Sequence, residues 1–308
     1  NMISYKLAGH LALVLAAGLL VTDRAIAEEQ PHYPTPDAAV QALVDAAASN
    51  EPGALAKVLG PDVKALRSGD PVADAADRQG FVDAAAESAR IEQDDDNHAV
   101  LTIGNDDWPF PIPLVRDAKG WYFDVAAGKE ELFNRRIGRN ELSTIAVLRA
   151  FVDAENEYAE KDRNRDGIRE YAQKLMSSKD AQDGLYWPSK EGEPESPMGP
   201  LIAEAVAAGY KPGQSSGPKP YHGYYYRMLT AQGRHAPGGA KSYINDGHMT
   251  KGFAALAYPA QYGNSGIMTF IVNQSGILFQ KDLGGDTAQA AAAIDAYDPD
   301  ESWQPVTD

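Results

Sequence analysis

NELSTIAVLRAFVDAENEYAEK (residues 140–161) predicts the longest helix of the chain and parts two halves with different patterns. Asn140 is a suitable N-cap, and the helix is expected to end near Lys161, where the polar stretch DRNRDG begins. Gly138 is the expected joint between the halves. The apolar residues recur at intervals that place them on one helical face, namely Leu142, Ile145, Leu148, Val152 and Tyr158.

The half that precedes this helix changes from helical to strand periodicity. Thr35, Pro36 and Asp37 form a helix start, and further helices are expected at 54–59 and 78–89. Short strands separated by turn residues follow at 99–103, 112–115 and 121–125. Helices followed by an antiparallel sheet predict an α+β domain over residues 36–137.

The half that follows repeats this order and forms the predicted second domain, residues 138–308. A helical piece is expected at 168–176, then a polar, Gly/Pro-rich loop at 177–200 and a helix at 201–208. Strands are expected at 224–230, 253–258, 266–272 and 277–281, with a last helix from Asp286 or Thr287 to Ala296. The fold class is therefore α+β with two domains.

The N-terminus has the three-part layout of a secretory signal peptide. Lys6 precedes an apolar run at 11–21, and Ala25-Ile26-Ala27 forms a small-residue cleavage site. We expect a signal peptide at 2–27, a leader at 28–35, and a periplasmic or secreted mature chain without an integral membrane span. The alternative is a retained anchor helix, although the run is shorter than the roughly 20 residues that a span needs.

Composition excludes several classes of function. The chain has no cysteine, which rules out disulfides, thiol catalysis and thiolate metal sites. Its formal net charge of −16 repels nucleic acid, so no nucleic-acid partner is expected.

DRNRDGIRE (162–170) has the start of a calcium-binding loop. Asp162, Asn164 and Asp166 alternate, and Gly167 allows the sharp turn that brings such ligands together. The Ile168 carbonyl and Glu170 complete the predicted oxygen set. A standard loop would have Glu at position 173, where this chain has Gln173. Four basic neighbours oppose a cation, so a solvated turn that ends the long helix is the alternative.

Aromatic residues mark a second candidate surface. YHGYYYRM (221–228) places His222, Tyr224 and Tyr226 together, and Trp108 in WPFPIP (108–113) is a separate candidate ligand-binding residue. Tyrosine offers an apolar face with a polar tip, which suits ligand binding. The same tyrosines on a half-buried strand would alternate between core and solvent, and this alternative stays open. GNSG (263–266) is expected to be a turn, since a hydrolase elbow requires G-x-S-x-G.

Several stretches resemble a bacterial family of exported proteins, DUF2950. They are GNDDWPFPIPLV (104–115), IGRNELSTI (137–145), DRNRDGIREYAQK (162–174), GYYYRMLTAQG (223–233) and YGNSGIMTFIVNQSGILFQKDLG (262–284). The resemblance implies an envelope-associated protein without an assigned activity, and no catalytic residue is carried over. In fold, the first half is similar to NTF2-like and cystatin-like domains, and the second half to a pseudopilin head.

The sequence favours a non-catalytic binding or scaffolding protein of the envelope with a structural calcium loop. Its partner would be an unknown envelope protein or a small ligand. The alternative is a hydrolase in which His222 or His248 converges with acids under the 177–200 loop. A third hypothesis is a small-ligand carrier, which requires an apolar cavity framed by Trp108, Phe110, Trp121 and Phe123.

Overall fold

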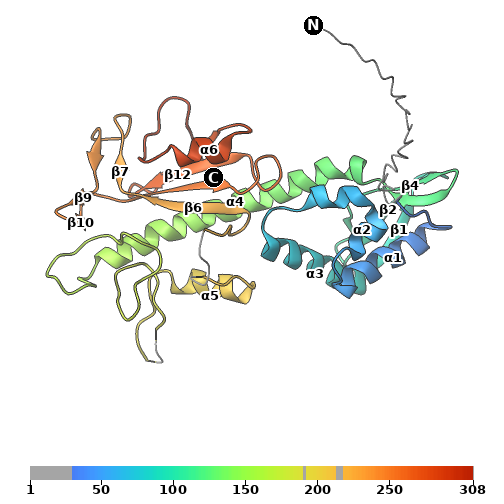
Figure 1. Cartoon of the computed structure of the whole chain (residues 1–308), viewed down its shortest axis with the longest axis horizontal. Coiled ribbons are helices and arrows are strands. Elements are labelled where there is room, and N and C mark those ends of the chain that lie inside the picture. The colour runs from blue at the N-terminus through green and yellow to red at the C-terminus, as the bar shows by residue number, and fades with distance from the viewer. Residues whose placement is uncertain (1–29, 190–191, 213–217, 308) are drawn as a thin grey trace, which may run out of the picture.

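The computed structural model describes residues 30–189, 192–212 and 218–307, so the predicted signal peptide lies outside the described residues. One long helix, α4 (Val125–Ala159), runs along the molecule (Figure 1). Short helices and one antiparallel sheet surround its N-terminal part, and a second antiparallel sheet covers its C-terminal part. Mixed helices and antiparallel sheets confirm the predicted α+β class.

Helix α4 begins earlier than the sequence pattern predicts. It has 35 residues and is therefore about 50 Å long. Its N-cap is Asp124, whose Oδ1 accepts the backbone N–H of Ala127 at 3.0 Å. The predicted start at Asn140 is wrong, because Asn140 lies buried within the helix and donates from Nδ2 to the carbonyl oxygen of Ser265 at 2.9 Å. The helix also passes through Gly138, the expected joint, without a break.

The first half packs three helices and a 3-10 turn against a five-stranded antiparallel sheet. The strand order is β1-β2-β4-β5, and β3 pairs with β2. Leu101, Leu114 and Phe123 point into a core that helix α1 closes with Leu43. The elements are α1 (Pro36–Ser49), α2 (Ala54–Leu59), η1 (Pro61–Leu66), α3 (Pro71–Glu87), β1 (Ala89–Gln93), β2 (His98–Ile103), β3 (Trp108–Pro109), β4 (Leu114–Asp117) and β5 (Gly120–Phe123).

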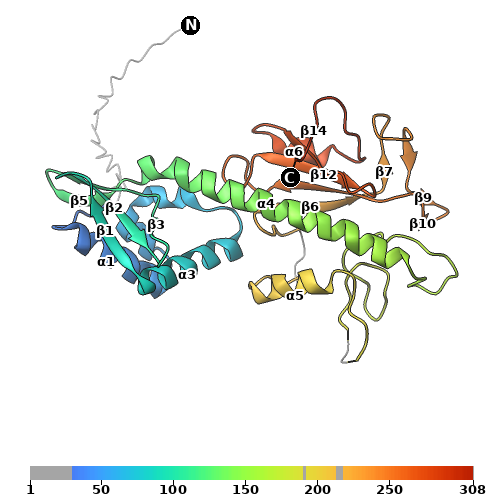
Figure 2. The ribbon, with the colours of Figure 1, turned by 180° about the vertical axis from the view of Figure 1, so that it is seen from behind.

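The second half is built on another five-stranded antiparallel sheet, in the order β14-β13-β12-β11-β6 (Figure 2). Two short ladders, β7-β8 and β9-β10, extend from it. The elements are α5 (Gly199–Ala207), β6 (Tyr224–Leu229), β7 (Ala231–Gln232), β8 (Lys241–Ser242), β9 (Ile244–Asn245), β10 (His248–Met249), β11 (Ala254–Pro259), β12 (Met268–Asn273), β13 (Phe279–Asp282), α6 (Thr287–Ala292) and β14 (Gln304–Pro305).

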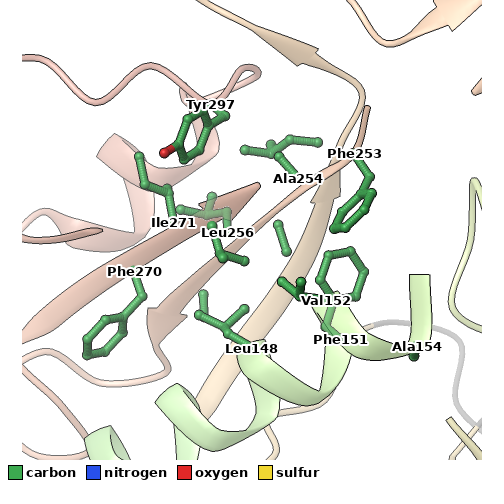
Figure 3. Close-up of a cluster of buried hydrophobic side chains, with 14 of the residues drawn as sticks. Leu148, Phe151, Val152, Ala154, Phe253, Ala254, Leu256, Phe270, Ile271 and Tyr297 are labelled. Atoms are coloured by element: carbon green, nitrogen blue, oxygen red, sulfur yellow. The ribbon is translucent and has the colours of Figure 1, made fainter. Parts of the chain in front are cut away.

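The C-terminal part of α4 packs directly on this sheet. Figure 3 shows Leu148 and Val152 of the helix facing Leu256 and Phe270 of the central strands. These side chains are almost completely buried. Burying a side chain of this size contributes roughly 1.5–3 kcal/mol, so the contact is a main source of stability for this half.

The helix predicted at 168–176 is absent, because its backbone groups bond to other elements instead. The N–H of Tyr171 donates to the carbonyl of Met249 at 2.9 Å, and the N–H of Ala172 donates to Oε2 of Glu155 at 2.8 Å. Neither donor is then available for a helical bond to the residue four positions earlier. The segment is irregular and joins the end of α4 to the β9-β10 ladder.

Gly128 sets how closely α4 approaches the first half. A Cβ at this position would lie 2.5 Å from Cα of Ile112 and 2.6 Å from the carbonyl oxygen of Pro111. We therefore expect Gly128→Ala to lower the free energy of unfolding by roughly 2 kcal/mol, through overpacking against backbone. Gly138→Ala is the matched control, because a Cβ there meets nothing within 4 Å. It should raise stability by about 0.5–1 kcal/mol through helix propensity, and denaturant titration measures both changes.

Glu155 is a buried carboxyl group within α4. Its Oε2 accepts the N–H of Ala172, and its Oε1 has no hydrogen-bond partner among the described residues. Burial raises the pKa of Glu155 well above its ordinary value of 4.5, and the bond from Ala172 opposes this only in part. At pH values between 4.5 and the raised pKa, Glu155 of the folded chain keeps a proton that the unfolded chain has lost. Stability therefore falls as pH rises through this window.

Glu155→Gln should remove this pH dependence, because it keeps an acceptor for Ala172 and cannot ionise. As pH rises above about 5, the wild type should lose free energy of unfolding relative to the variant, by up to about 1.4 kcal/mol per pH unit until the raised pKa is passed. Denaturant titrations at several pH values measure the difference, with Glu157→Gln as the exposed control on the same helix. A wild-type-minus-variant difference that stays constant with pH would contradict the buried, protonated state.

Candidate metal centre

The loop that follows α4 is organised by the carboxylate of Asp162. Its Oδ1 accepts the N–H of Arg165 at 2.7 Å, and its Oδ2 accepts the N–H of Gly167 at 2.8 Å. Gly167 has a φ angle of 90°, a left-handed backbone conformation that residues with a Cβ rarely adopt. The sharp turn predicted at this glycine is therefore present, and Asp162 holds it closed.

Asn164, Asp166 and Glu170 come together on one side of this turn. Nδ2 of Asn164 lies 2.7 Å from Oδ2 of Asp166 and 2.7 Å from Oε1 of Glu170. The amide thus bridges two carboxylates that would otherwise repel one another. Of the five predicted ligands, Asp166 and Glu170 converge with their oxygens, whereas Oδ1 of Asn164 accepts the N–H of Asp166 at 3.2 Å. The carboxylate of Asp162 accepts backbone N–H groups, and Ile168 donates its N–H to Oδ1 of Asp166 at 2.8 Å.

His248 reaches the same point from the β9-β10 ladder. Glu170 positions it, because Oε2 of Glu170 accepts the N–H of the next residue, Met249, at 3.1 Å. Nδ1 of His248 lies 3.3 Å from Oε2 of Glu170 and 3.5 Å from Oδ2 of Asp166. That nitrogen is buried and has no hydrogen-bond partner among the described residues.

These distances suit one shared cation. Ligand atoms of Asp166, Glu170 and His248 all lie within 4.8 Å of one another. Metal–ligand bonds of about 2.0–2.6 Å place neighbouring ligand atoms roughly 3–4 Å apart, and Nδ1 of His248 lies at 3.3 and 3.5 Å from the two carboxylate oxygens. Carboxylate and amide oxygens suit calcium, and the imidazole widens the donor set toward transition metals.

One of the basic neighbours points away from this centre. The guanidinium of Arg163 donates to the carbonyl oxygens of Tyr158 at 3.4 Å and Glu157 at 3.2 Å, and it lies over the ring of Trp187. Cations near the last carbonyls of a helix are favourable. Arg163 therefore stabilises the end of α4 and opposes a bound cation less than the sequence suggests.

His248 was not predicted as a ligand of this loop from the sequence. Spacing gives no signal for it, because the contact depends on the pairing of β9 with β10. The convergence of His248 with acids is one part of the hydrolase alternative, which also requires a deep pocket covered by the 177–200 loop.

The predicted aromatic ligand residues do not form one surface. Tyr224 is fully buried, and its hydroxyl donates to the carbonyl of Met268 at 2.9 Å, so this side chain belongs to the core. Tyr226 donates to Oγ1 of Thr144 at 3.2 Å, close to α4. His222 is half-buried and packs against Tyr221, with the ring centroids 4.2 Å apart and the rings tilted by 51°. Trp108 lies in β3 and is 44% exposed.

Ser265 lies in the turn that its sequence predicts. The residue is completely buried, its hydroxyl donates to the carbonyl of Gln261 at 3.2 Å, and it accepts the N–H of Gln261 at 2.9 Å. Asn264 beside it donates to the carbonyl of Arg67 at 2.6 Å. The GNSG stretch therefore docks one half of the chain on the other.

Within residues 30–189, 192–212 and 218–307, no helix combines the length and the apolar character that crossing a membrane requires. No curated protein and no solved structure matches the chain. A family profile, DUF2950, described as a protein of unknown function, matches residues 30–306, which is nearly the whole sequence. The chain therefore belongs to the DUF2950 family.

Proposed function

We propose that this is an exported, non-catalytic binding or scaffolding protein of the bacterial envelope, stabilised by a structural calcium ion. The convergence of ligand atoms from Asp166, Glu170 and His248 within 4.8 Å supports the cation. Asn164 would add its amide oxygen to this set if the amide group rotated by half a turn. Asp162 and the carbonyl oxygen of Ile168 are the remaining predicted ligands of the loop.

The proposed ion is structural because of what its ligands connect. Asp166 and Glu170 follow the end of α4, whereas His248 belongs to a hairpin of the second sheet. A cation between them would hold the helix end against this hairpin. It would also offset the repulsion between two carboxylates, one of which is nearly buried.

Export is supported by the signal-type sequence at 2–27. The partner would be another envelope protein or a small ligand, since the charge of −16 disfavours nucleic acid. The likeness of the first half to NTF2-like and cystatin-like domains, and of the second half to a pseudopilin head, stays a prediction.

A hydrolase is the second candidate, because His248 meets acids as that hypothesis requires. The two carboxylates that face Nδ1 of His248 also accept the backbone N–H groups of Ile168 and Met249, and this tie between loop and hairpin favours the structural role. If the protein hydrolysed a simple ester in a metal-dependent way, and His248→Gln abolished this activity, the hydrolase would become the preferred candidate function.

Calcium should stabilise the protein after treatment with a chelator. A cation that binds only the folded chain adds about 2.7 kcal/mol at 100 times its Kd, which raises the melting temperature in a thermal-shift titration. Asp166→Asn removes a ligand charge and should weaken calcium binding at least about tenfold. His248→Gln should affect zinc more than calcium, because imidazole is the softer donor.

His235→Gln is the matched control, because Nδ1 of His235 lies 3.0 Å from Oδ2 of Asp298 in a similar pair elsewhere. It should leave the titration unchanged. The absence of a shift with any divalent cation, or an equal shift in Asp166→Asn, would reject the centre. A response to zinc alone that depends on His248 would reject calcium and keep the metal centre.

A further inference from the structure

A hollow of about 380 Å³ lies between α3 and α4, away from the metal centre. Aromatic side chains supply much of its apolar wall: Phe81 from α3, and Phe110 and Trp108 from β3 and the loop after it. The rings of Phe81 and Phe110 pack with centroids 5.2 Å apart. Ligand pockets typically have volumes of about 300–1,000 Å³ and mostly apolar walls, so this groove has the size and lining of a small-molecule site.

Basic side chains of α4 line the opposite wall. Three arginines, Arg135, Arg136 and Arg139, face one lining acid, Asp77. Arg139 pairs with Asp77 at 2.8 Å, and Arg135 pairs with Glu131 at 2.6 Å and lies over the ring of Trp108 with its guanidinium 4.8 Å from the centroid. Arg136 is the arginine of this wall without an ion pair among the described residues. In a chain with a net charge of −16, this group makes the groove locally complementary to an anion.

Arg136 has hydrogen-bonding capacity that the protein does not use. The residue is only 9% exposed, and one terminal nitrogen donates to Oδ1 of Asn264. Its Nε is buried and has no hydrogen-bond partner among the described residues. Leaving a buried charged donor without a partner costs free energy. Arg136 lines the groove, so an anion bound there would lie beside this guanidinium group. Burial lowers the pKa of Arg136, although the nearby carboxylates of Asp74 and Asp77 oppose this.

We propose that this groove binds a small amphipathic carboxylate. Its apolar body would lie on Phe81, Trp108 and Phe110, and its carboxylate would accept hydrogen bonds at the arginine wall. The planar guanidinium matches the two oxygens of a carboxylate better than an ammonium does. The inference rests on the proposed binding role, for which it names a ligand class, and it uses residues separate from the metal centre.

Gly80 offers a way to block the groove without disturbing the fold. It lines the groove from α3, and a Cβ there meets nothing within 4 Å. Gly80→Leu would therefore fill the site, and leucine favours a helix over glycine. Gly138→Leu is the matched control, because it makes the same change at another open helical glycine that does not line this groove.

The experiment titrates the full chain with octanoate and with 3-phenylpropionate by calorimetry, and with the corresponding neutral amides. We expect saturable binding of an acid, at least about tenfold tighter than that of its amide. Gly80→Leu should weaken binding of the acid at least about tenfold, whereas Gly138→Leu should bind it as the wild type does. Arg135→Lys should bind the acid slightly more weakly than the wild type. Arg136→Lys should lose most of the preference for the acid over the amide, because lysine lacks the planar fork.

The proposal would be overturned if neither acid bound saturably up to about 10 mM, or if both glycine variants bound the acid equally well. Equal affinity for acid and amide would also reject it, because the arginine wall would then play no part. Asp166→Asn is titrated in parallel. Because that substitution lies outside the groove, loss of the metal response and loss of carboxylate binding are separate results.

Discussion

One uninterrupted helix carries both hydrophobic clusters of the chain. The first turns of α4 contribute Val125 to the cluster around Phe123, and its later turns contribute Leu148 and Phe151 to the cluster on the second sheet. Each backbone bond in a helix links residues four positions apart, so the distance between the clusters is fixed by the length of the rod. The two halves can change their separation only if that hydrogen-bonding pattern breaks.

Polar contacts then fix how the halves are turned about this rod. The buried carboxylate of Asp70 caps α3 through its Oδ1, and its Oδ2 accepts the hydroxyl of Tyr210 at 2.8 Å and the N–H of Gly223 at 3.1 Å. Asn140 and Arg136 of α4 hold the turn at Ser265 and Asn264. The groove lies beside this junction, and the metal centre lies beyond the far end of α4. About 20 residues of helix, or roughly 30 Å, separate them, which favours two sites that work independently.

The sequence predicts the elements of this fold better than their boundaries. Helix 54–59 and the strands that begin near Ala99, Tyr224 and Ala254 follow from local pattern alone. The start of α4 does not, because Gly138 and Asn140 look like a break, whereas an open environment tolerates the glycine and Ser265 satisfies the asparagine. Likewise, the turn at Gly167 can be predicted from the sequence, but His248 reaches it only through the pairing of β9 with β10. Ligands that are close in sequence can therefore be predicted from the local pattern, whereas a ligand that arrives through the tertiary fold cannot.

Hydrogen exchange along α4 tests the continuity of the rod most directly. An unbroken helix anchored at both ends predicts that amides at 134–142 exchange as slowly as those at 145–155, because all of them lie within the same hydrogen-bonding pattern. Fast exchange confined to the residues around Gly138, with slow exchange on either side, would contradict it. Such a result would mean that the halves are joined by a hinge and that their relative placement is not set by α4.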